Sequence, residues 1–340
     1  PWVTLTHAAL MAQPGDTVYI LNGTYPETLA PARGGQDGLP ILFKALPGQQ
    51  PVLDGATLNG TPDGIRLDGS QVSQIGYVIF SGLTLRNFAQ SIQMVLGAHD
   101  CRFFDLDVSR GQGGLFLYGV SGVFVAQCRF HENDTYGVVL NNYCSDVLVR
   151  DCVSHDNASV EGGGFEADFT VSNVTLYRCS SYNNAGDGFD LQVDNLLISE
   201  CSSFYNTNGI HLWRNARVEN TLVYANQDQG VICDKLVGGK PSQTIVNCTV
   251  AKGHRVNNIE VRRDVSATIL NTISVGGDGP ALVFEDETTS SVLKRTILQT
   301  AREAQGVPTL VLGTSVRKTA LISGQINSGA LRDLTGLEAD

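Results

Sequence analysis

The 340-residue sequence has few charged residues, and the basic ones are the scarcer kind. Asp, Glu, Lys and Arg together make up 17% of the chain, and 23 basic residues stand against 34 acidic ones. The formal net charge of -11 argues against a general nucleic-acid-binding protein, which needs a basic face. No run of 18 or more apolar residues occurs, which excludes a transmembrane helix. We therefore expect neither nucleic acid nor a membrane among the partners.

Other missing features narrow the class of protein further. No two cysteines have the CxxC spacing, which argues against a zinc site. No window of ten residues in the repeated part shows helical periodicity, whereas 37 glycines and alternating apolar residues indicate short strands joined by tight turns. No signal peptide is visible before "PWVTLTHAAL", so we expect a processed or trimmed N-terminus.

What the sequence does contain is a repeat. The strings "VAQCRFHEN", "VRDCVSHDN", "LYRCSSYNN", "ISECSSFYN" and "VENTLVYAN" share an apolar residue three places before a Cys or Thr and an Asn five places after it. We take that Cys, Thr or equivalent residue as the anchor of each copy, with anchors roughly 20 to 27 residues apart. The nine anchors are Gly82, Leu106, Cys128, Cys152, Cys179, Cys201, Thr221, Cys248 and Thr272.

The period and the strand patterns predict an all-β fold, a right-handed parallel β-helix of about nine or more coils. Each copy contains a short strand before the anchor and another after a Gly, as in "DGFDLQ" and "NGIHLW", and equivalent strands of adjacent coils stack about 4.8 Å apart. A leucine-rich repeat is disfavoured because its spaced leucines are missing. The hand follows the usual crossover rule.

The two ends of the chain differ from the repeat. "LTHAALMAQPGD" predicts a short amphipathic helix followed by the strand "TVYILNGTY", so residues 1–22 form a cap over the first coil. We assign residues 1–289 to the β-helix with its cap. Residues 290–340 lose the repeat and form either a degenerate coil or a covering tail, with "RTILQTAREAQG" as a covering helix or part of a degenerate coil.

Stacked coils place equivalent side chains in rows. One row is an asparagine ladder at a bend, where amides hydrogen-bond from coil to coil: Asn87, Asn133, Asn157, Asn184, Asn206 and Asn226. Another row is inward and apolar: Cys128, Cys152, Cys179 and Cys201. We expect these thiols to be free, because adjacent side chains in a parallel stack point the same way.

Acidic residues gather on one outward face of the predicted helix. Alignment on the Gly of each second strand places Glu166, Asp168 and Asp190 outward, with Asp187 in the turn before and His211 directly above Asp190. Like charges this close repel unless a cation lies between them. We expect the four acids to bind a divalent cation, and their hard oxygen ligands favour Ca²⁺. The alternative is that the acids extend separately into water.

A basic row follows on the same face, which suits an acidic ligand. Its members are Arg214, Arg217, Lys235, Arg262 and Arg263. Trp213 offers a flat surface for a sugar ring, or else packs as a half-buried aromatic. The substrate-binding set predicted from these positions is Trp213, Arg217, Asp234 and Arg262.

Two stretches resemble a known family. "AQPGDTVYILNGTYPETL" with "GLPILFKALPGQQPVLDG" is similar to the cap and first coil of secreted right-handed β-helix proteins, especially family 9 pectate lyases. "CSSYNNAGDGFDL" resembles that family's calcium-binding coil, and the likeness spans roughly residues 1–285. Asp187 and Asp190 match calcium ligands, Gly186 and Gly163 stand where the family has aspartates, and His211 replaces its catalytic lysine.

The resemblance implies a secreted or cell-surface polysaccharide lyase, which we expect to be a monomer. It would cleave a uronate-containing polysaccharide such as pectate by calcium-assisted β-elimination, with His211, Lys235 and Arg214 as catalytic groups. A neutral imidazole is a suitable base near pH 7. Two alternatives remain: a glycoside hydrolase using Asp190 and Asp234, and a non-catalytic glycan-binding protein on the same fold.

Overall fold

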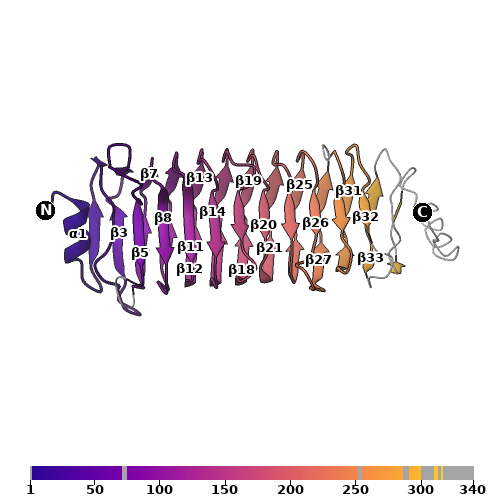
Figure 1. Cartoon of the computed structure of the whole chain (residues 1–340), viewed down its shortest axis with the longest axis horizontal. Helices are drawn as coiled ribbons and strands as arrows, with labels where there is room; N and C mark the ends of the chain where they lie inside the picture. Colours follow the sequence, from indigo (N-terminus) through magenta and orange to yellow (C-terminus); the bar gives the residue numbers. More distant parts are fainter. Residues whose placement is uncertain are drawn as a thin grey trace. The chain divides into compact units, whose positions relative to one another are not determined.

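The computed structural model describes residues 2–70, 75–251, 255–285, 291–299, 310–312 and 315–316. It consists of two compact units, Pro1–Ser180 with Asn184–Gly186, and Ser181–Asn183 with Asp187–Asp340. We call them unit 1 and unit 2. Each unit consists of parallel strands in three sheets, here named A, B and C (Figure 1). This is the all-β parallel β-helix that the repeat predicts.

Unit 1 begins with the predicted cap. Helix α1 (Leu5–Met11) starts at Thr4, whose side chain accepts a hydrogen bond from the His7 N–H, and it buries Leu5, Ala8 and Ala9. Among the described residues, no helix is long and apolar enough to cross a membrane.

The strands of unit 1 follow in order. Sheet A contains β1 (Thr17–Ile20), β3 (Ile41–Ala45), β6 (Val78–Ser81), β9 (Arg102–Phe104), β12 (Ser121–Ala126), β15 (Ser145–Arg150) and β18 (Ser172–Tyr177). Sheet B contains β2 (Thr24–Tyr25), β4 (Val52–Asp54), β7 (Thr84–Arg86), β10 (Asp107–Ser109), β13 (Arg129–His131) and β16 (Val153–His155). Sheet C contains β5 (Ile65–Asp68), β8 (Gln90–Val95), β11 (Gly113–Tyr118), β14 (Val138–Asn141) and β17 (Phe165–Ala167).

The chain passes into unit 2 at β19 (Ser180–Tyr182). In unit 2, sheet A contains β21 (Asp194–Ser199), β24 (Ala216–Glu219), β27 (Ser242–Val246), β30 (Ser266–Leu270), β33 (Val292–Lys294) and β35 (Leu310–Leu312). Sheet B contains β22 (Ser202–Phe204), β25 (Leu222–Tyr224), β28 (Thr249–Ala251), β31 (Ile273–Val275), β34 (Ile297–Gln299) and β36 (Ser315–Val316). Sheet C contains β20 (Phe189–Leu191), β23 (Ile210–Leu212), β26 (Val231–Cys233), β29 (Ile259–Val261) and β32 (Leu282–Phe284).

The segment from residue 290 onward has both described and undescribed parts. Strands β33 to β36 continue sheets A and B of unit 2. Within "RTILQTAREAQG" the described part includes β34, and residues 300–306 lie outside the described residues.

Register confirms three anchors of unit 1, Leu106, Cys128 and Cys152, and four of unit 2, Cys201, Thr221, Cys248 and Thr272. It corrects the first anchor. Thr84, Asp107 and Arg129 are Cα partners on adjacent strands of sheet B, so Leu83 is the residue equivalent to Leu106 and Cys128. Leu83 is 1% exposed, as an inward anchor should be. Gly82, the anchor predicted from the sequence, instead has a φ of 72° and belongs to the turn before the strand.

The asparagine ladder is confirmed within each unit. The Asn133 and Asn157 side-chain amides donate to the next carbonyl oxygen, at 3.0 Å to Asn157 Oδ1 and 2.8 Å to Asn184 Oδ1. In unit 2, Asn206 Nδ2 donates to Asn226 Oδ1 at 3.3 Å. The shifted first copy makes Asn87 an exception, because it lies one place before the ladder, has a φ of 61° and binds Asp54.

All eight cysteines are buried and none is in a disulfide, as the inward row predicts. The thiols at the anchors donate to main-chain carbonyls, for example Cys201 Sγ to Ser199 O at 3.3 Å. Burial raises the pKa of Cys101 and of Cys233 to about 12, so neither thiol forms a reactive thiolate near neutral pH.

We therefore expect the cysteines to resist alkylation in the folded protein. At pH 8 a small alkylating reagent should leave all eight thiols unmodified, because burial withholds them from the reagent. The same reagent should label all eight after denaturation without reductant. Intact-mass spectrometry checks both states, and a pair of cysteines that stays unlabelled after denaturation would reveal a disulfide.

Candidate active site

The candidate site lies on the outer face of sheet C in unit 2. Phe189, Ile210 and Val231 are register partners on β20, β23 and β26, and all three are at most 1% exposed. Because successive side chains alternate across a strand, the following residues, Asp190 and His211, project from the opposite face. Asp187 precedes β20 in the turn that leads into it.

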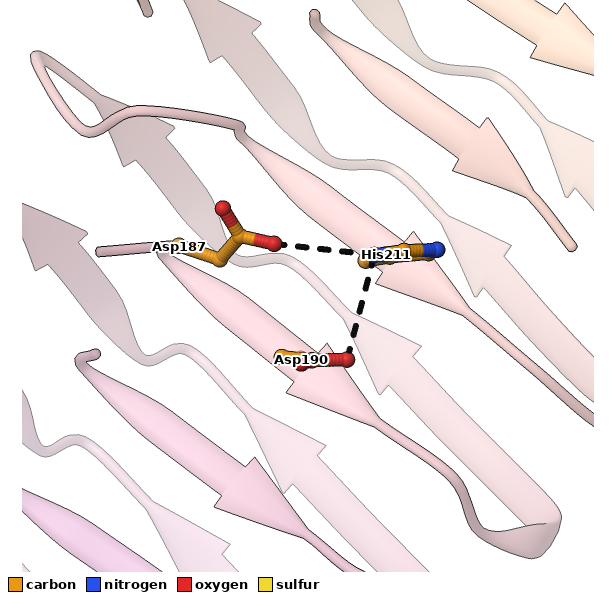
Figure 2. A group of neighbouring side chains, drawn as sticks. All are labelled: Asp187, Asp190 and His211. Atoms are coloured by element: carbon orange, nitrogen blue, oxygen red, sulfur yellow. Dashed lines mark ion pairs between the residues drawn. The ribbon is translucent and has the colours of Figure 1, made fainter. Parts of the chain in front are cut away.

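His211 is surrounded by three carboxylates. Its Nδ1 lies 3.6 Å from Asp187 Oδ2 and 4.0 Å from Asp190 Oδ1, the two contacts drawn in Figure 2. Its other nitrogen, Nε2, lies 3.2 Å from Asp234 Oδ2. Both ring nitrogens therefore face an acid, an arrangement that suits a doubly protonated imidazole.

The side chain of Arg262 continues the cluster beyond Asp234. Its Nη1 donates to Asp234 Oδ2, and its Nε donates to Glu260 Oε1 at 3.0 Å. Glu260 is only 7% exposed, and its other oxygen accepts hydrogen bonds from Gln229 and Asn257. These bonds fix the guanidinium in place while 35% of the Arg262 side chain stays exposed.

Trp213 covers the imidazole on one side. The two rings stack with centroids 4.2 Å apart and an angle of 25° between their planes. The indole Nε1–H donates to Asp190 Oδ1 at 2.6 Å. This contact supports the packing alternative for Trp213, since its ring already lies on His211.

The three acidic contacts govern the charge of His211. Burial alone lowers the pKa of an imidazole, but the carboxylates of Asp187, Asp234 and Asp190 together raise the pKa of His211 to about 9. His211 is thus an imidazolium at pH 7. The expected neutral base is wrong for this arrangement, because a protonated ring has no lone pair with which to accept a proton.

The two flanking aspartates differ in acidity. Burial raises the pKa of Asp190, and its contacts with His211 and Trp213 offset this only in part. Burial also acts on Asp234, but the bonds from His211 and the Lys235 N–H, with the charge of Arg262, hold the pKa of Asp234 below its usual value. Asp190 is therefore the weaker acid and the better proton acceptor of the two.

Other predicted site residues lie elsewhere or have structural partners. Arg217 is on β24 in sheet A, exposed and paired with Glu219, so it does not share the face of His211. Arg214 lies in the turn before β24, 3.8 Å from Asp194. Lys235 forms an ion pair with Asp264.

The two acids from the preceding coil belong to unit 1. Glu166 is half-buried on β17, where it is the register partner of Val139. Both oxygens of Asp168 are hydrogen-bonded locally, one by the Thr170 N–H and hydroxyl and the other by the Asn142 N–H. Those bonds give Asp168 a structural role in its own turn.

The sequence interpretation missed several polar residues that support the site. Asn208 donates from its main chain and its amide to Asp187 Oδ1, at 3.2 and 2.8 Å, and its own Oδ1 accepts from the Gln229 N–H. Glu260 stands in the same outward column as Asp190 and His211, a position that the sequence shows, but residue spacing does not show that its carboxylate binds Arg262. Although His211 and Glu260 lie on the outer face of the sheet, they are only 9% and 7% exposed, because neighbouring side chains cover them.

One group of described residues has the spacing of metal ligands. Asp187, Asp190 and His211 offer one ligand atom each, all within 4.8 Å of one another. The set contains only two carboxylates, whereas Ca²⁺ takes six to eight oxygen ligands. An imidazolium already supplies positive charge between them. The donor set therefore does not fit a resident calcium ion.

The glycine at position 186 is a second argument against a calcium site. A Cβ at Gly186 would lie 1.6 Å from the carbonyl oxygen of Gly162, far inside any allowed contact. The backbone of this turn thus excludes the aspartate that the resemblance would place there. The missing ligand is a consequence of how the coil is packed.

The family model of the Pel9A-like right-handed β-helix region matches residues 1–216. The chain belongs to this family. The matched part confirms the predicted hand of the helix and includes Asp187, Asp190, His211 and Trp213.

Three individual proteins show the range of the likeness. Pectate lyase PEL9 of Emericella nidulans is 26% identical over 170 residues, which cover 49% of this chain and 38% of the relative. The mannuronan C-5 epimerase AlgE6 A-module of Azotobacter vinelandii has a TM-score of 0.60 at 16% identity, over 92% of both chains. PfbA, a surface adhesin of Streptococcus pneumoniae, has a TM-score of 0.56 at 13% identity, over 93% of this chain and 87% of its own.

These likenesses establish the fold and leave the activity to the site. The two solved structures share the fold with this chain at low identity, and their titles name an epimerase and an adhesin. The chain spans less than two-fifths of the length of the curated pectate lyase. The activity therefore depends on the residues around His211.

Proposed function

We propose that this chain is a polysaccharide lyase that cleaves a uronate-containing polysaccharide, such as pectate, by β-elimination at the His211 site. The observation that carries the proposal is the row formed by Asp190, His211 and Arg262, a proton acceptor, a buried cation and an exposed cation on one face. Family membership supports it, because one curated relative is a pectate lyase. We also propose that the chain acts outside the cytoplasm, as a monomer.

The reaction needs three functions from the protein. A base takes the proton from C5 of the uronate, the C4–O4 bond breaks as the C4–C5 double bond forms, and the departing O4 takes up a proton. Negative charge grows on the uronate carboxylate as the C5 proton leaves, so a fixed cation beside it lowers the barrier.

The side chains around His211 can fill these roles. Asp190 is the candidate base, because its pKa is raised, 35% of its side chain is exposed and its Oδ2 has no hydrogen bond to a described residue. Arg262 is the candidate for binding the uronate carboxylate, and Arg214, in the turn before β24, is a second cation for the same ligand. His211 is the cation between them and the proton donor for the departing O4.

The calcium expected from the resemblance is not required in this proposal. Asp187 and Asp190 stand at the family's ligand positions, but His211 and Arg262 already provide the positive charge at this site. The chemistry that calcium supplies in such enzymes is neutralisation of the substrate carboxylate. Here the guanidinium and imidazolium supply that neutralisation.

We expect calcium to leave the stability of the protein unchanged. Addition of 1–10 mM CaCl₂, an excess over any site of useful affinity, should not raise the melting temperature, because a ligand stabilises only the state that binds it. Differential scanning fluorimetry measures this, with Asp190→Asn as the matched control. A shift of several degrees in the unmutated protein that disappears in Asp190→Asn would show a calcium site and contradict our reading of the donor set.

A glycoside hydrolase is the second candidate, and one observation favours it. Asp190 and Asp234 flank opposite nitrogens of His211, and their pKa values are shifted in opposite directions, as expected for a general acid and a general base. Product analysis separates the two functions. A lyase gives unsaturated ends that absorb near-ultraviolet light, whereas a hydrolase gives reducing ends only, and a panel of uronate polymers tests both.

A further inference from the structure

A cleft of about 710 Å³ lies on the outer face of sheet A in unit 1, on a different sheet from the candidate active site. Its floor is a row of register partners on adjacent strands, Ile79, Arg102, Phe124 and Leu148. Three of these four are apolar, and Leu148 is 37% exposed. An apolar row on an outer sheet face is unusual where polar side chains would be expected.

A rigid turn forms one wall of the cleft. Gln36 and Leu39 exchange main-chain hydrogen bonds of 3.1 and 2.9 Å, which place Asp37 at the tip. The Gly35 N–H donates to Gly76 O at 2.9 Å, and a Cβ on Gly35 would lie 2.6 Å from Tyr77 O. The turn is therefore packed against the next coil, and the cleft is formed in advance of any ligand.

Tyr77 occupies a backbone position that does not suit it. Its φ is 52°, in the left-handed region, and register places it in line with Asp100, Gly122, Asp146 and Asn173, all of which also have positive φ. Those four are residue types that adopt this conformation readily, whereas a tyrosine does so only under strain. Other bulky residues, such as Leu96, Tyr143 and Tyr205, also have a positive φ, so the conformation of Tyr77 supports a binding role only together with its place in the cleft.

Polar groups in the cleft complete a binding surface. Within the described part of the chain, the side chains of Asp37 and Arg102 have no hydrogen bond or ion pair, so both are available to a ligand. Asp100 lies beside Tyr77, and its carboxylate raises the pKa of the Tyr77 hydroxyl. Asp100 Oδ2 is 2.9 Å from His99 Nδ1, which leaves its other oxygen for a ligand. The cleft thus combines two aromatic rings with two carboxylates and a single guanidinium.

We infer that this cleft is a second carbohydrate-binding site, and that it takes a neutral sugar chain. The C–H face of a pyranose ring packs on the rings of Tyr77 and Phe124, and carboxylates accept hydrogen bonds from neighbouring hydroxyls. Two carboxylates against one guanidinium disfavour a polyuronate electrostatically. The site would hold neutral parts of a polysaccharide while the His211 site acts on its uronates.

Electrophoresis in gels containing one polysaccharide at a time tests this inference. The probes are soluble galactan, arabinan and xyloglucan as neutral polymers and polygalacturonate as the acidic one. We expect at least one neutral polymer to retard the unmutated protein. Tyr77→Asn and Asp37→Asn should each weaken that retardation by about five- to tenfold, the value of one good ring or hydrogen-bond contact.

Stability measurements separate binding from folding. Tyr77→Asn should melt at the same temperature as the unmutated protein or higher, because asparagine suits a positive φ. His211→Ala should keep the retardation, since its site lies in unit 2, so failure of the proposed lyase activity would leave this test intact. Unchanged retardation in both cleft variants, retardation by polygalacturonate alone, or none by any neutral polymer would overturn the inference.

Discussion

Replacing His211 with alanine should abolish most lyase activity and also destabilise unit 2. The imidazolium lies between Asp187, Asp190 and Asp234, so its removal leaves three partly buried carboxylates without their shared cation. Breaking a buried charge pair costs about 3–5 kcal/mol of unfolding free energy. Loss of the proton donor should lower kcat by about 10²- to 10⁴-fold. Initial rates of unsaturated product and denaturant unfolding measure the two effects.

Two further variants separate the effect of the positive charge of His211 from the effect of its shape. His211→Gln can still donate a hydrogen bond but carries no charge, so it should lose both activity and stability. His211→Lys keeps a positive charge and should recover part of the stability without the activity. A glutamine variant with the unmutated rate would mean that the charge of His211 has no part in the reaction.

The difference in unfolding free energy between the unmutated protein and His211→Gln should also depend on pH. The pKa of His211 is about 9 in the folded state and near 6.5 in the unfolded chain, so folding binds a proton between these values. The stabilisation from His211 is therefore complete below pH 6.5 and is lost as the pH rises through 9. Unfolding free energies of the unmutated protein and His211→Gln should converge over that range.

Replacing Asn157 with leucine should destabilise the β-helix by about 3–5 kcal/mol. Asn157 is 1% exposed, and its side chain accepts bonds from the Asn133 N–H and amide while donating to Ser154 Oγ and Asn184 Oδ1. Leucine matches its size but leaves these buried groups without partners, at about 1–3 kcal/mol for each unsatisfied group. Equilibrium denaturation should show the loss directly.

An exposed asparagine row provides the matched control. Asn247 accepts an amide bond from Asn271 and donates one to Asn220, but its side chain is in solvent. Asn247→Gly keeps the positive φ of 54° and removes only these exposed bonds, so it should change stability by about 0.5 kcal/mol or less. Equal losses for the two variants would show that burial of the inner ladder contributes nothing.

The fold could be predicted from the sequence because equivalent positions in successive coils have the same environment, so the same residue types recur with the period of the coil. Anchors such as Cys128 and Cys152 recur with the period of the coil, and the structure places them in register. The predicted anchor of the first copy is one residue too early, because Gly82 and Asn87 match the pattern although both belong to turns and have a positive φ. Spacing alone does not distinguish a turn glycine from an inward anchor.

The position of the site could be predicted from the sequence, but the protonation state of His211 could not. Column counting found Asp190, His211 and Asp234 because stacked coils convert equal positions into neighbours. It misplaced Arg217, since the turn after β23 carries the chain to sheet A before that residue. The protonation of His211 depends on which atoms face its two nitrogens and on burial, and neither quantity is encoded in residue spacing.

The charge of His211 at neutral pH tests the central claim most directly. Nitrogen NMR of protein labelled with ¹⁵N-histidine, with the His211 signals assigned by comparison with His211→Gln, reports the protonation of both ring nitrogens. We expect a doubly protonated ring at pH 7 that titrates near pH 9, with the same spectrum in calcium and in chelator. A ring that is neutral at pH 7, or that becomes neutral when calcium is added, would contradict it.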